Sequence, residues 1–217
     1  MLVSAILCKN EAAKDLGRVL TNARSFADLV LVLDDGSTDG SVKMAKQHGA
    51  VVRHRKRPGA WGNESPARQE LWEWAAEVAG NGWVLIQDAD QELVGDPRPF
   101  CETDLLNTWC LPLYDLWDGE TTYRCDGYWQ AHKHPRPWLF CPSRHPDGWV
   151  AEWPERGIHP GHCPINFPMV AGVADGLYWK HRAYIDKARR SVKLTQYESR
   201  ASQLTDWELR HARSIGD

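Results

Sequence analysis

The first ninety or so residues alternate between short apolar segments and longer segments with helical periodicity. Between the first two apolar segments, Leu16, Val19, Leu20 and Ala23 recur at the spacing of one helix face. Such alternation is typical of a parallel β-sheet covered by helices, because parallel strands need a long crossover between them. We therefore predict strands at 2–7, 29–33, 50–53 and 83–87, and helices at 11–26, 40–48 and 66–79.

Two of these predicted helices follow recognisable start signals. Pro66 stands where the helix 66–79 begins, a position at which proline costs no backbone hydrogen bond. Ser37 and Thr38 precede the helix 40–48, and either hydroxyl is a candidate for its N-cap.

After Pro99 the pattern changes, and tryptophan, proline, histidine and glycine become frequent. Most of the 12 tryptophans lie in the later part of the chain. Packing is the ordinary role of such rings, and a few of them are candidates to line a site for a sugar ring or a base. We predict short strands at 108–113, 138–140 and 177–180, followed by helix over 185–209.

Composition excludes several classes of protein. Lysine and arginine total 26 against 29 acids, and this formal net charge of −3 argues against a broadly basic nucleic-acid-binding surface. Apolar runs such as 29–33 are far too short to cross a bilayer, and the first eight residues lack the basic region and cleavage site of a signal peptide. We therefore expect a cytoplasmic protein without a transmembrane segment, whose six cysteines are free thiols.

Carboxylates follow two of the predicted strands. Asp34 and Asp35 come directly after the strand 29–33, and Asp88 and Asp90 follow the strand 83–87. Ligands of open α/β sheets bind beyond the carboxyl ends of the strands, where these four acids would meet. Because like charges repel one another, we expect a cation or a ligand rich in hydrogen-bond donors beside them.

The acids stand in three motifs that together resemble family 2 glycosyltransferases of the GT-A fold. The motifs are Ile-Leu-Cys-Lys-Asn-Glu at 6–11, Val-Leu-Asp-Asp-Gly-Ser-Thr-Asp-Gly at 32–40 and Trp-Val-Leu-Ile-Gln-Asp-Ala-Asp at 83–90. The Lys-Asn-Glu opening is most similar to a lipopolysaccharide-core-type or phage-type branch. The resemblance implies an α/β fold, the GT-A three-layer sandwich with a mostly parallel central sheet. It also implies a single domain over 1–217, with a nucleotide-sugar-binding half at 1–98, an acceptor-facing half at 99–183 and a C-terminal helical segment at 184–217.

This resemblance implies transfer of a sugar from a nucleotide-diphospho-sugar to an acceptor hydroxyl, with inversion. Mn²⁺ or Mg²⁺ would stabilise the diphosphate leaving group as a Lewis acid, and both ions accept carboxylate ligands. By resemblance, the metal ligands are Asp88, Asp90 and His181, although His181 also fits a histidine that is merely hydrogen-bonded at a strand end. The donor-binding residues implied by the resemblance are Cys8, Asn10, Glu11, Asp34, Asp35, Arg68 and Asp88.

The catalytic base has more than one candidate. Inverting transfer needs a carboxylate or imidazole that takes the proton of the acceptor hydroxyl. Related enzymes often show a histidine-glutamate pair in this region, but here proline follows His159. We favour Glu155 or His159, with Glu152 and Asp175 in the same part of the chain.

Several alternatives stay open. The cysteines and histidines between 125 and 163 would suit a structural zinc ion, although their spacing matches no standard zinc finger. The basic run 53–57 is either a solvated loop or a binding segment for a diphosphate or an anionic acceptor.

The acceptor is expected to be a surface glycan or a lipid-linked saccharide. The alternatives are a 5-hydroxymethylated pyrimidine in DNA and, from another class, a non-catalytic nucleotide- or carbohydrate-binding module. A sugar-nucleotide pyrophosphorylase is disfavoured, because no glycine-rich phosphate loop follows Leu7.

Overall fold

The computed structural model describes residues 1–59, 63–155 and 160–216. Among these residues, seven strands form one sheet in the order β3-β2-β1-β4-β8-β6-β9. The first four strands in this order run parallel, whereas β8 is antiparallel to both β4 and β6. The sheet confirms the predicted α/β class with a mostly parallel centre. The strand bounds are β1 Leu2–Cys8, β2 Leu29–Asp34, β3 Val51–His54, β4 Trp83–Asp88, β6 Thr108–Leu111, β8 Arg136–Phe140 and β9 Ala171–Val173.

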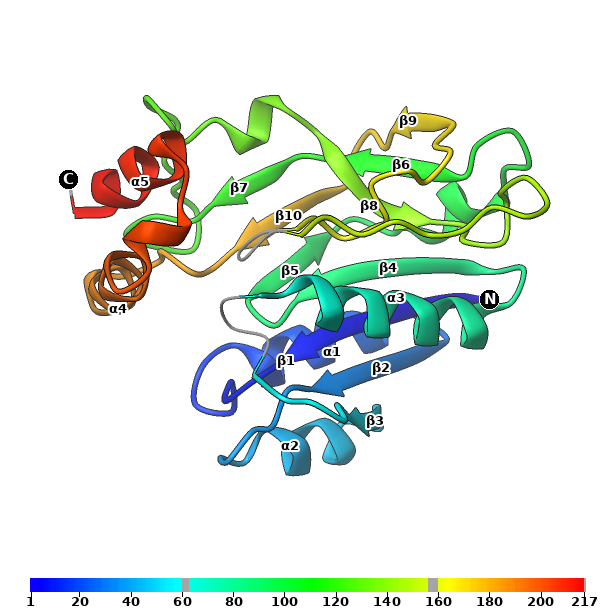
Figure 1. Ribbon diagram of the computed structural model, residues 1–217, viewed down its shortest axis with the longest axis horizontal. Coiled ribbons are helices and arrows are strands. Elements are labelled where there is room, and N and C mark those ends of the chain that lie inside the picture. Colours follow the sequence, from blue (N-terminus) through cyan, green and yellow to red (C-terminus); the bar gives the residue numbers. More distant parts are fainter. Residues whose placement is uncertain (60–62, 156–159, 217) are drawn as a thin grey trace.

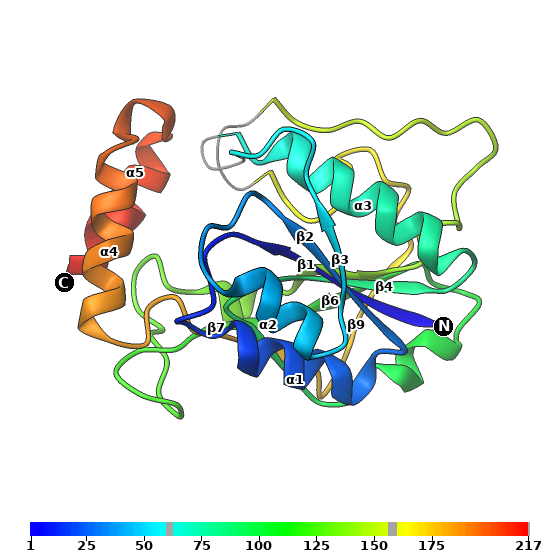
Figure 2. The same cartoon turned by 90° about the horizontal axis from the view of Figure 1, so that it is seen from below.

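Helices cover both faces of the parallel part of the sheet (Figure 2). Successive side chains of a strand point to opposite faces, so each strand contributes to two apolar clusters. Ile6 and Leu85 lie in the cluster that contains the buried face of α1, whereas Ala5 and Ile86 lie in the cluster that contains α3. The result is a three-layer sandwich. The helix bounds are α1 Leu16–Phe26, α2 Ser41–Gln47 and α3 Ser65–Ala79.

The first helix is shorter than predicted. The prediction of helix from residue 11 is wrong, because α1 begins only at Leu16. The backbone N–H groups of Glu11 and Ala12 donate to the Ser41 hydroxyl, at 2.8 and 3.0 Å. These bonds hold residues 11–15 as a loop against the start of α2.

The predicted N-caps of α2 are also wrong. The Asp39 carboxylate accepts the Ser41 N–H at 2.9 Å at the start of this helix. Ser37 and Thr38 instead bind the loop after β1, through the backbone N–H and the side-chain oxygen of Asn10.

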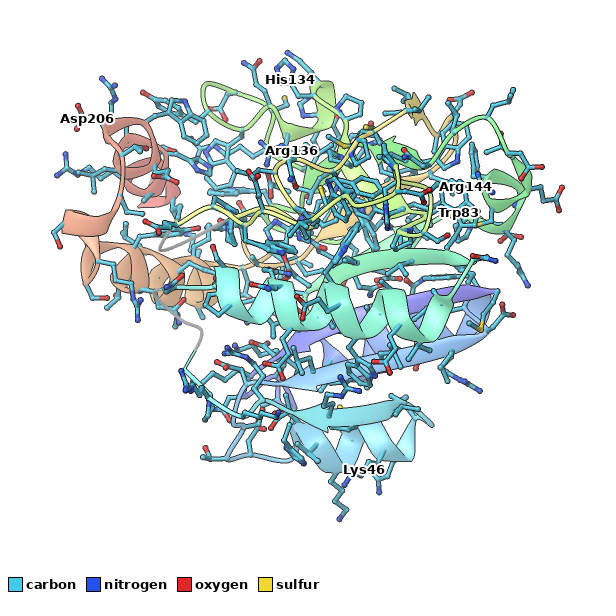
Figure 3. The ribbon with its side chains drawn as sticks, turned by 45° about the vertical axis from the view of Figure 1, so that its right-hand side comes forward. Lys46, Trp83, His134, Arg136, Arg144 and Asp206 are labelled. Atoms are coloured by element: carbon cyan, nitrogen blue, oxygen red, sulfur yellow. The ribbon has the colours of Figure 1, made fainter. Side chains whose placement is uncertain are left out.

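The second half of the chain extends the large sheet and builds a small one. The single strand predicted at 108–113 is wrong: it is divided at Pro112 into β6 of the large sheet and β7 (Leu113–Asp115) of a three-stranded sheet. Proline has no N–H for a strand ladder, which suits the point where the chain changes sheets. The small sheet has the order β5-β10-β7, with β5 Gln91–Val94 and β10 Tyr178–His181; β5 and β9 were not predicted. Figure 3 shows Arg144 beside Trp83, and its guanidinium lies 5.4 Å from the indole centre, tying the connection after β8 to the start of β4.

The helical segment predicted over 185–209 is two helices, α4 (Lys187–Glu198) and α5 (Asp206–Arg213). Thr205 caps α5, and its exchange of hydrogen bonds with Glu208 forms a capping box that starts the second helix. The two helices stand beyond the carboxyl ends of β1 and β2 (Figures 1 and 2). A separate buried cluster of Trp129, Ala183, Tyr184, Tyr197, Ala212 and Ile215 anchors them.

No helix within the described ranges has the length and apolarity needed to cross a bilayer.

Candidate active site

The parallel register brings the acids of the motifs to one edge of the sheet. Cys8, at the end of β1, pairs with Asp34 of β2, and its neighbour Leu7 pairs with Asp88 of β4. Asp34 and Asp88 therefore end the two strands on either side of β1. This register places Asp34 and Asp88 at one edge of the sheet, as expected for carboxylates that follow parallel strands.

Asp34 is buried and held within its own turn. Its carboxylate accepts the backbone N–H groups of Gly36 and Ser37 and shares a 3.0 Å hydrogen bond with Nδ1 of His54. Burial alone would raise the pKa of Asp34, but the hydrogen bonds from Ser37, His54 and Gly36 outweigh it and lower the pKa below its ordinary value. Asp34 is thus a fixed negative charge at the end of β2.

The Asp35 carboxylate forms ion pairs with two basic side chains. Its side chain, 2% exposed, lies 2.5 Å from Nη1 of Arg55 and 3.4 Å from Nζ of Lys9. Adjacent acids at this edge are tolerated because each has its own partners.

The loop after β1 is braced against the same turn. Asn10 adopts a left-handed backbone conformation, with φ of 53°, and its side-chain oxygen accepts the Thr38 N–H at 2.8 Å. Beneath the loop, burial raises the pKa of the Cys8 thiol to about 12, which excludes a thiolate there at neutral pH.

Asp88 lies between an arginine and a histidine. Arg68, in the first turns of α3, places Nη2 2.6 Å from Oδ1 of Asp88, while Nε2 of His162 lies 3.6 Å from Oδ2. Burial alone would raise the pKa of Asp88, but the charge of Arg68 and the interaction with His162 hold it well below the ordinary range. Nε and Nη1 of Arg68 are buried without a hydrogen-bond partner among the described residues. The arginine therefore keeps donors for a further anionic group.

Asp90, directly before β5, faces His181 at the end of the neighbouring strand β10 of the small sheet. Nε2 of His181 lies 3.6 Å from Oδ2 of Asp90, and its Nδ1 lies 2.6 Å from Oδ1 of Asp115. Burial alone would lower the pKa of His181, but Asp90 and the hydrogen bond to Asp115 raise it to about 10. The opposite effect lowers the pKa of Asp90, where the charge of His181 outweighs burial.

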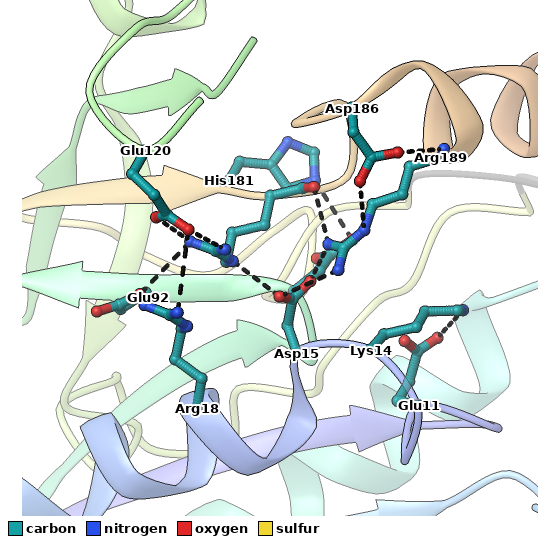
Figure 4. Close-up of polar contacts among 11 residues, drawn as sticks. Glu11, Lys14, Asp15, Arg18, Glu92, Glu120, His181, Asp186 and Arg189 are labelled. Atoms are coloured by element: carbon teal, nitrogen blue, oxygen red, sulfur yellow. Dashed lines mark hydrogen bonds and ion pairs between the residues drawn. The ribbon is translucent and has the colours of Figure 1, made fainter. Parts of the chain in front are cut away.

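A buried ion-pair network fixes the connection that follows His181 (Figure 4). Nε of Arg182 donates to Asp15 at 2.8 Å, and its two terminal nitrogens donate to the Glu120 carboxylate at 2.5 Å. Arg189 of α4 also binds the Asp15 carboxylate. The start of α1 is thereby joined to the start of α4, beside the site.

Residues 5–163 match the family model described as glycosyl transferase family 2. The chain belongs to this family. An uncharacterized glycosyltransferase of Rickettsia felis is 36% identical over 88 residues, covering 41% of this chain and 28% of that protein. The chain thus matches less than a third of the length of that relative.

One solved structure is similar to this chain in fold over nearly its whole length. S. aureus TarS is similar over 99% of this chain and 42% of its own, with 12% sequence identity and a TM-score of 0.56. A Mycobacterium tuberculosis glucosyl-3-phosphoglycerate synthase, solved with Mn²⁺ and UDP, covers 53% of this chain and 44% of its own at 23% identity and a TM-score of 0.38. Family and architecture together confirm the predicted GT-A fold.

The side chains at this site suit a hard divalent cation only when a bound molecule supplies further oxygen atoms to the metal. Within 1–59, 63–155 and 160–216 no three His, Cys, Asp or Glu side chains form a group that could hold a metal. Asp90 and His181 face each other, while Asp88 is turned to Arg68. Mg²⁺ and similar ions are commonly held by one or two carboxylates together with substrate phosphates. The residues fit that kind of site, to which a diphosphate contributes oxygens.

Three residues of the candidate site were not assigned from the sequence. Asp115 binds His181. His162, which we considered only for zinc, lies beside Asp88 with its ring centre 3.9 Å from that of Trp138 and the two rings tilted by 40°. The third is Lys193 of α4; burial would lower its pKa, but Asp90 and other nearby groups, including Tyr197, raise it. Only Lys193 could have been found from the sequence, because it lies on a predicted helix rich in basic residues. The roles of Asp115 and His162 depend on contacts between distant segments.

The candidate bases stay predictions. Glu155 is exposed, and His159 lies outside the described residues. The described cysteines and histidines between 125 and 163 supply no group of three that could hold a zinc ion. Instead Cys141 is buried near the Asn81 carbonyl, and His162 faces Asp88.

We expect the stability of the metal-free protein to fall as the pH rises from about 6.5 to about 10. The pKa of His181 is raised from 6.5 to about 10 in the folded protein, so protonation favours folding over that range and its contribution is complete below 6.5. The slope reaches up to about 1.4 kcal/mol per pH unit for one proton. Urea unfolding at several pH values, with a chelator present, measures it.

His181→Gln is the matched variant for this measurement. Other groups titrate in the same interval, Cys8 among them, and they remain in the variant. The difference between the two stability curves therefore isolates the imidazole. Parallel curves for the two proteins would show that His181 is not charged by its neighbours.

Proposed function

We propose that this chain is a metal-dependent, inverting glycosyltransferase that uses a nucleotide-diphospho-sugar donor. The observation that carries the proposal is the facing pair of Asp90 and His181 beside Asp88, at the carboxyl edge of the parallel strands. A carboxylate and an imidazole are suitable ligands for Mn²⁺, and Asp90 with His181 would hold the ion. Bound there, the metal would supply Lewis-acid stabilisation of the departing nucleoside diphosphate.

The chain's own residues would bind and orient the donor. Arg68 offers two buried, unpartnered nitrogens, Nε and Nη1, to phosphate oxygens while keeping its bond to Asp88. Lys193, held cationic by the surrounding acids, adds positive charge from the α4 side. Asp34 and the loop carrying Asn10 would hold the nucleoside, with Cys8, Glu11 and Asp35 forming the support around them. Fixed charges of this kind stabilise developing phosphate charge without having to reorganise.

On the acceptor side, we propose Glu155 as the base that removes the hydroxyl proton. The segment just before it is tied to the start of α3, where the Ser65 hydroxyl donates to the Pro154 carbonyl at 2.5 Å. The same helix carries Arg68, which reaches Asp88. The tether supports a position of Glu155 beside the donor edge, and His159 is the second candidate.

We propose a surface glycan of the lipopolysaccharide-core type, or a lipid-linked saccharide, as the acceptor in preference to DNA. Much of the basic run 53–57 is engaged within the protein. Arg53 lies 4.4 Å from the centre of the Trp74 ring, His54 binds Asp34, and Arg55 binds Asp35. A DNA-binding surface needs cations that are free to contact phosphates, and the engaged side chains of this run do not supply them.

Calorimetric titration tests the donor half of the proposal. The Mn²⁺-loaded protein is titrated with a panel of nucleoside diphosphates and nucleotide-sugars, and each titration is repeated with a chelator. Metal-dependent binding of one member supports the proposal and identifies the donor. No binding by the folded, Mn²⁺-loaded protein would instead indicate a non-catalytic module.

Glu155→Gln and His159→Ala then test the base. Loss of the base is expected to lower turnover by about 10²- to 10⁴-fold with donor binding unchanged. Unchanged turnover in Glu155→Gln would remove Glu155 from the mechanism. Binding of duplex DNA that weakens steeply with salt would favour the DNA acceptor.

A further inference from the structure

Asp115 and His181 lie side by side at the ends of two parallel strands. In the small sheet, β7 pairs with β10 so that Asp115 is opposite His181. Beyond this point the backbone N–H of Leu116 donates to the His181 carbonyl at 2.9 Å, and the N–H of Arg124 donates to the Asp115 carbonyl at 3.1 Å. The relative position of the two side chains is therefore set by backbone hydrogen bonds on both residues.

The contact between the two side chains is short and largely excluded from water. Nδ1 of His181 lies 2.6 Å from Oδ1 of Asp115, and the side chains are 16% and 11% exposed, respectively. The ring of Tyr184 lies edge-on to the imidazole at 5.4 Å. These contacts restrict rotation of the imidazole about its side-chain bonds.

With Nδ1 held by Asp115, the other ring nitrogen faces Asp90. Nε2 of His181 is 3.6 Å from Oδ2 of Asp90, too long for a hydrogen bond. An imidazole that donates from one nitrogen to a carboxylate presents the other nitrogen, with its lone pair, to a metal. The order Asp115, His181, Asp90 is thus a carboxylate, an imidazole and an open position beside a second carboxylate.

We propose that Asp115 is a positioning residue that orients His181 so that Nε2 faces the divalent cation. The inference rests on the proposed function, in which His181 and Asp90 hold that cation. Asp115 itself does not contact the metal or the donor. It acts by fixing the ring orientation and by keeping the proton on Nδ1.

A double-mutant cycle tests this role by Mn²⁺ binding in the presence of the nucleoside diphosphate found by calorimetry, followed by electron paramagnetic resonance, without an activity assay. Asp115→Ala is expected to weaken Mn²⁺ binding by a factor of about 10 to 100 in the otherwise unchanged protein. In the His181→Ala background the same substitution is expected to have no further effect, because the ring on which Asp115 acts is absent. Asp126→Ala is the matched control, since it removes an acid from the same connection that binds Arg124 and not His181.

Asp115→Asn serves if the alanine variant does not fold, which thermal unfolding will show. Its amide keeps the size of the side chain but can donate to Nδ1, and this places the ring proton on Nε2, where the metal must bind. Mn²⁺ binding is therefore expected to weaken in this variant as well.

Each other outcome has a distinct meaning. An equal loss of affinity in both backgrounds would show that Asp115 acts only through its charge, which overturns the positioning role. Weaker binding in His181→Ala with full affinity in both Asp115 variants would overturn this inference and leave the proposed metal site standing. Unchanged binding in His181→Ala would overturn the proposed ligand itself.

Discussion

Replacement of Asp90 by alanine is expected to lower the rate of sugar transfer by about 10³-fold while the protein remains folded. The loss corresponds to about 4 kcal/mol of transition-state stabilisation. Asp90 is one of two groups that face each other at the proposed metal position, with His181 3.6 Å away. Its removal would leave the imidazole without the carboxylate on which a hard cation depends. In this variant His181 keeps its contact with Asp115 at 2.6 Å, so the protein is expected to remain folded.

Single-turnover transfer from the donor found by calorimetry, together with Mn²⁺ affinity and urea unfolding, checks this expectation. Asp96→Ala is the control, because Asp96 is an exposed acid whose contact is with Arg98 at 2.9 Å. Its rate is expected to match that of the unchanged protein. Full activity in Asp90→Ala would remove Asp90 from the catalytic machinery.

Replacement of Asp15 by alanine is expected to lower the free energy of unfolding by about 3 kcal/mol. Asp15 is 4% exposed and binds both Arg182 and Arg189, of which Arg182 is itself 5% exposed. Removal of one partner from a buried ion pair leaves an uncompensated charge, which costs more than the pair contributes. Glu120 remains bound to Arg182 and limits the loss.

Urea unfolding measures this effect, and Asp186→Ala provides the comparison. Asp186 caps α4 through the Arg189 N–H and is 54% exposed, so its loss is expected to cost about 1 kcal/mol. Equal losses in the two variants would mean that the Asp15 network contributes no more than an exposed cap. A larger loss for Asp15 would support the network as the joint between α1 and α4.

The first half of the fold was predictable because its signals are local. Each strand of the parallel sheet is a short apolar run, and each helix repeats apolar residues at its own period over one segment. The start of α1 could not be predicted in this way. Glu11 is compatible with helix, but its N–H is bound by Ser41, 30 positions along the chain.

The second half was less predictable because its strands are short and their partners are distant. β5 and β9 span four and three residues, too few to show an alternating pattern. The division of the predicted strand 108–113 depends on which sheet accepts each part. Pro112 marks the division, but proline alone does not show that β7 joins β10.

Three features were predictable from the sequence alone: the family, the order of strands and helices in the first half, and the acids that end β2 and β4. These follow from residues that are neighbours in the chain, because periodicity and strand-end turns are local properties. The contacts between site residues that are distant in the sequence became visible only in the folded protein. Asp115 meets His181 across 66 positions, and Asp15 meets Arg182 across 167. Such pairs form where separate elements pack together, and no local sequence pattern predicts which distant elements will pack.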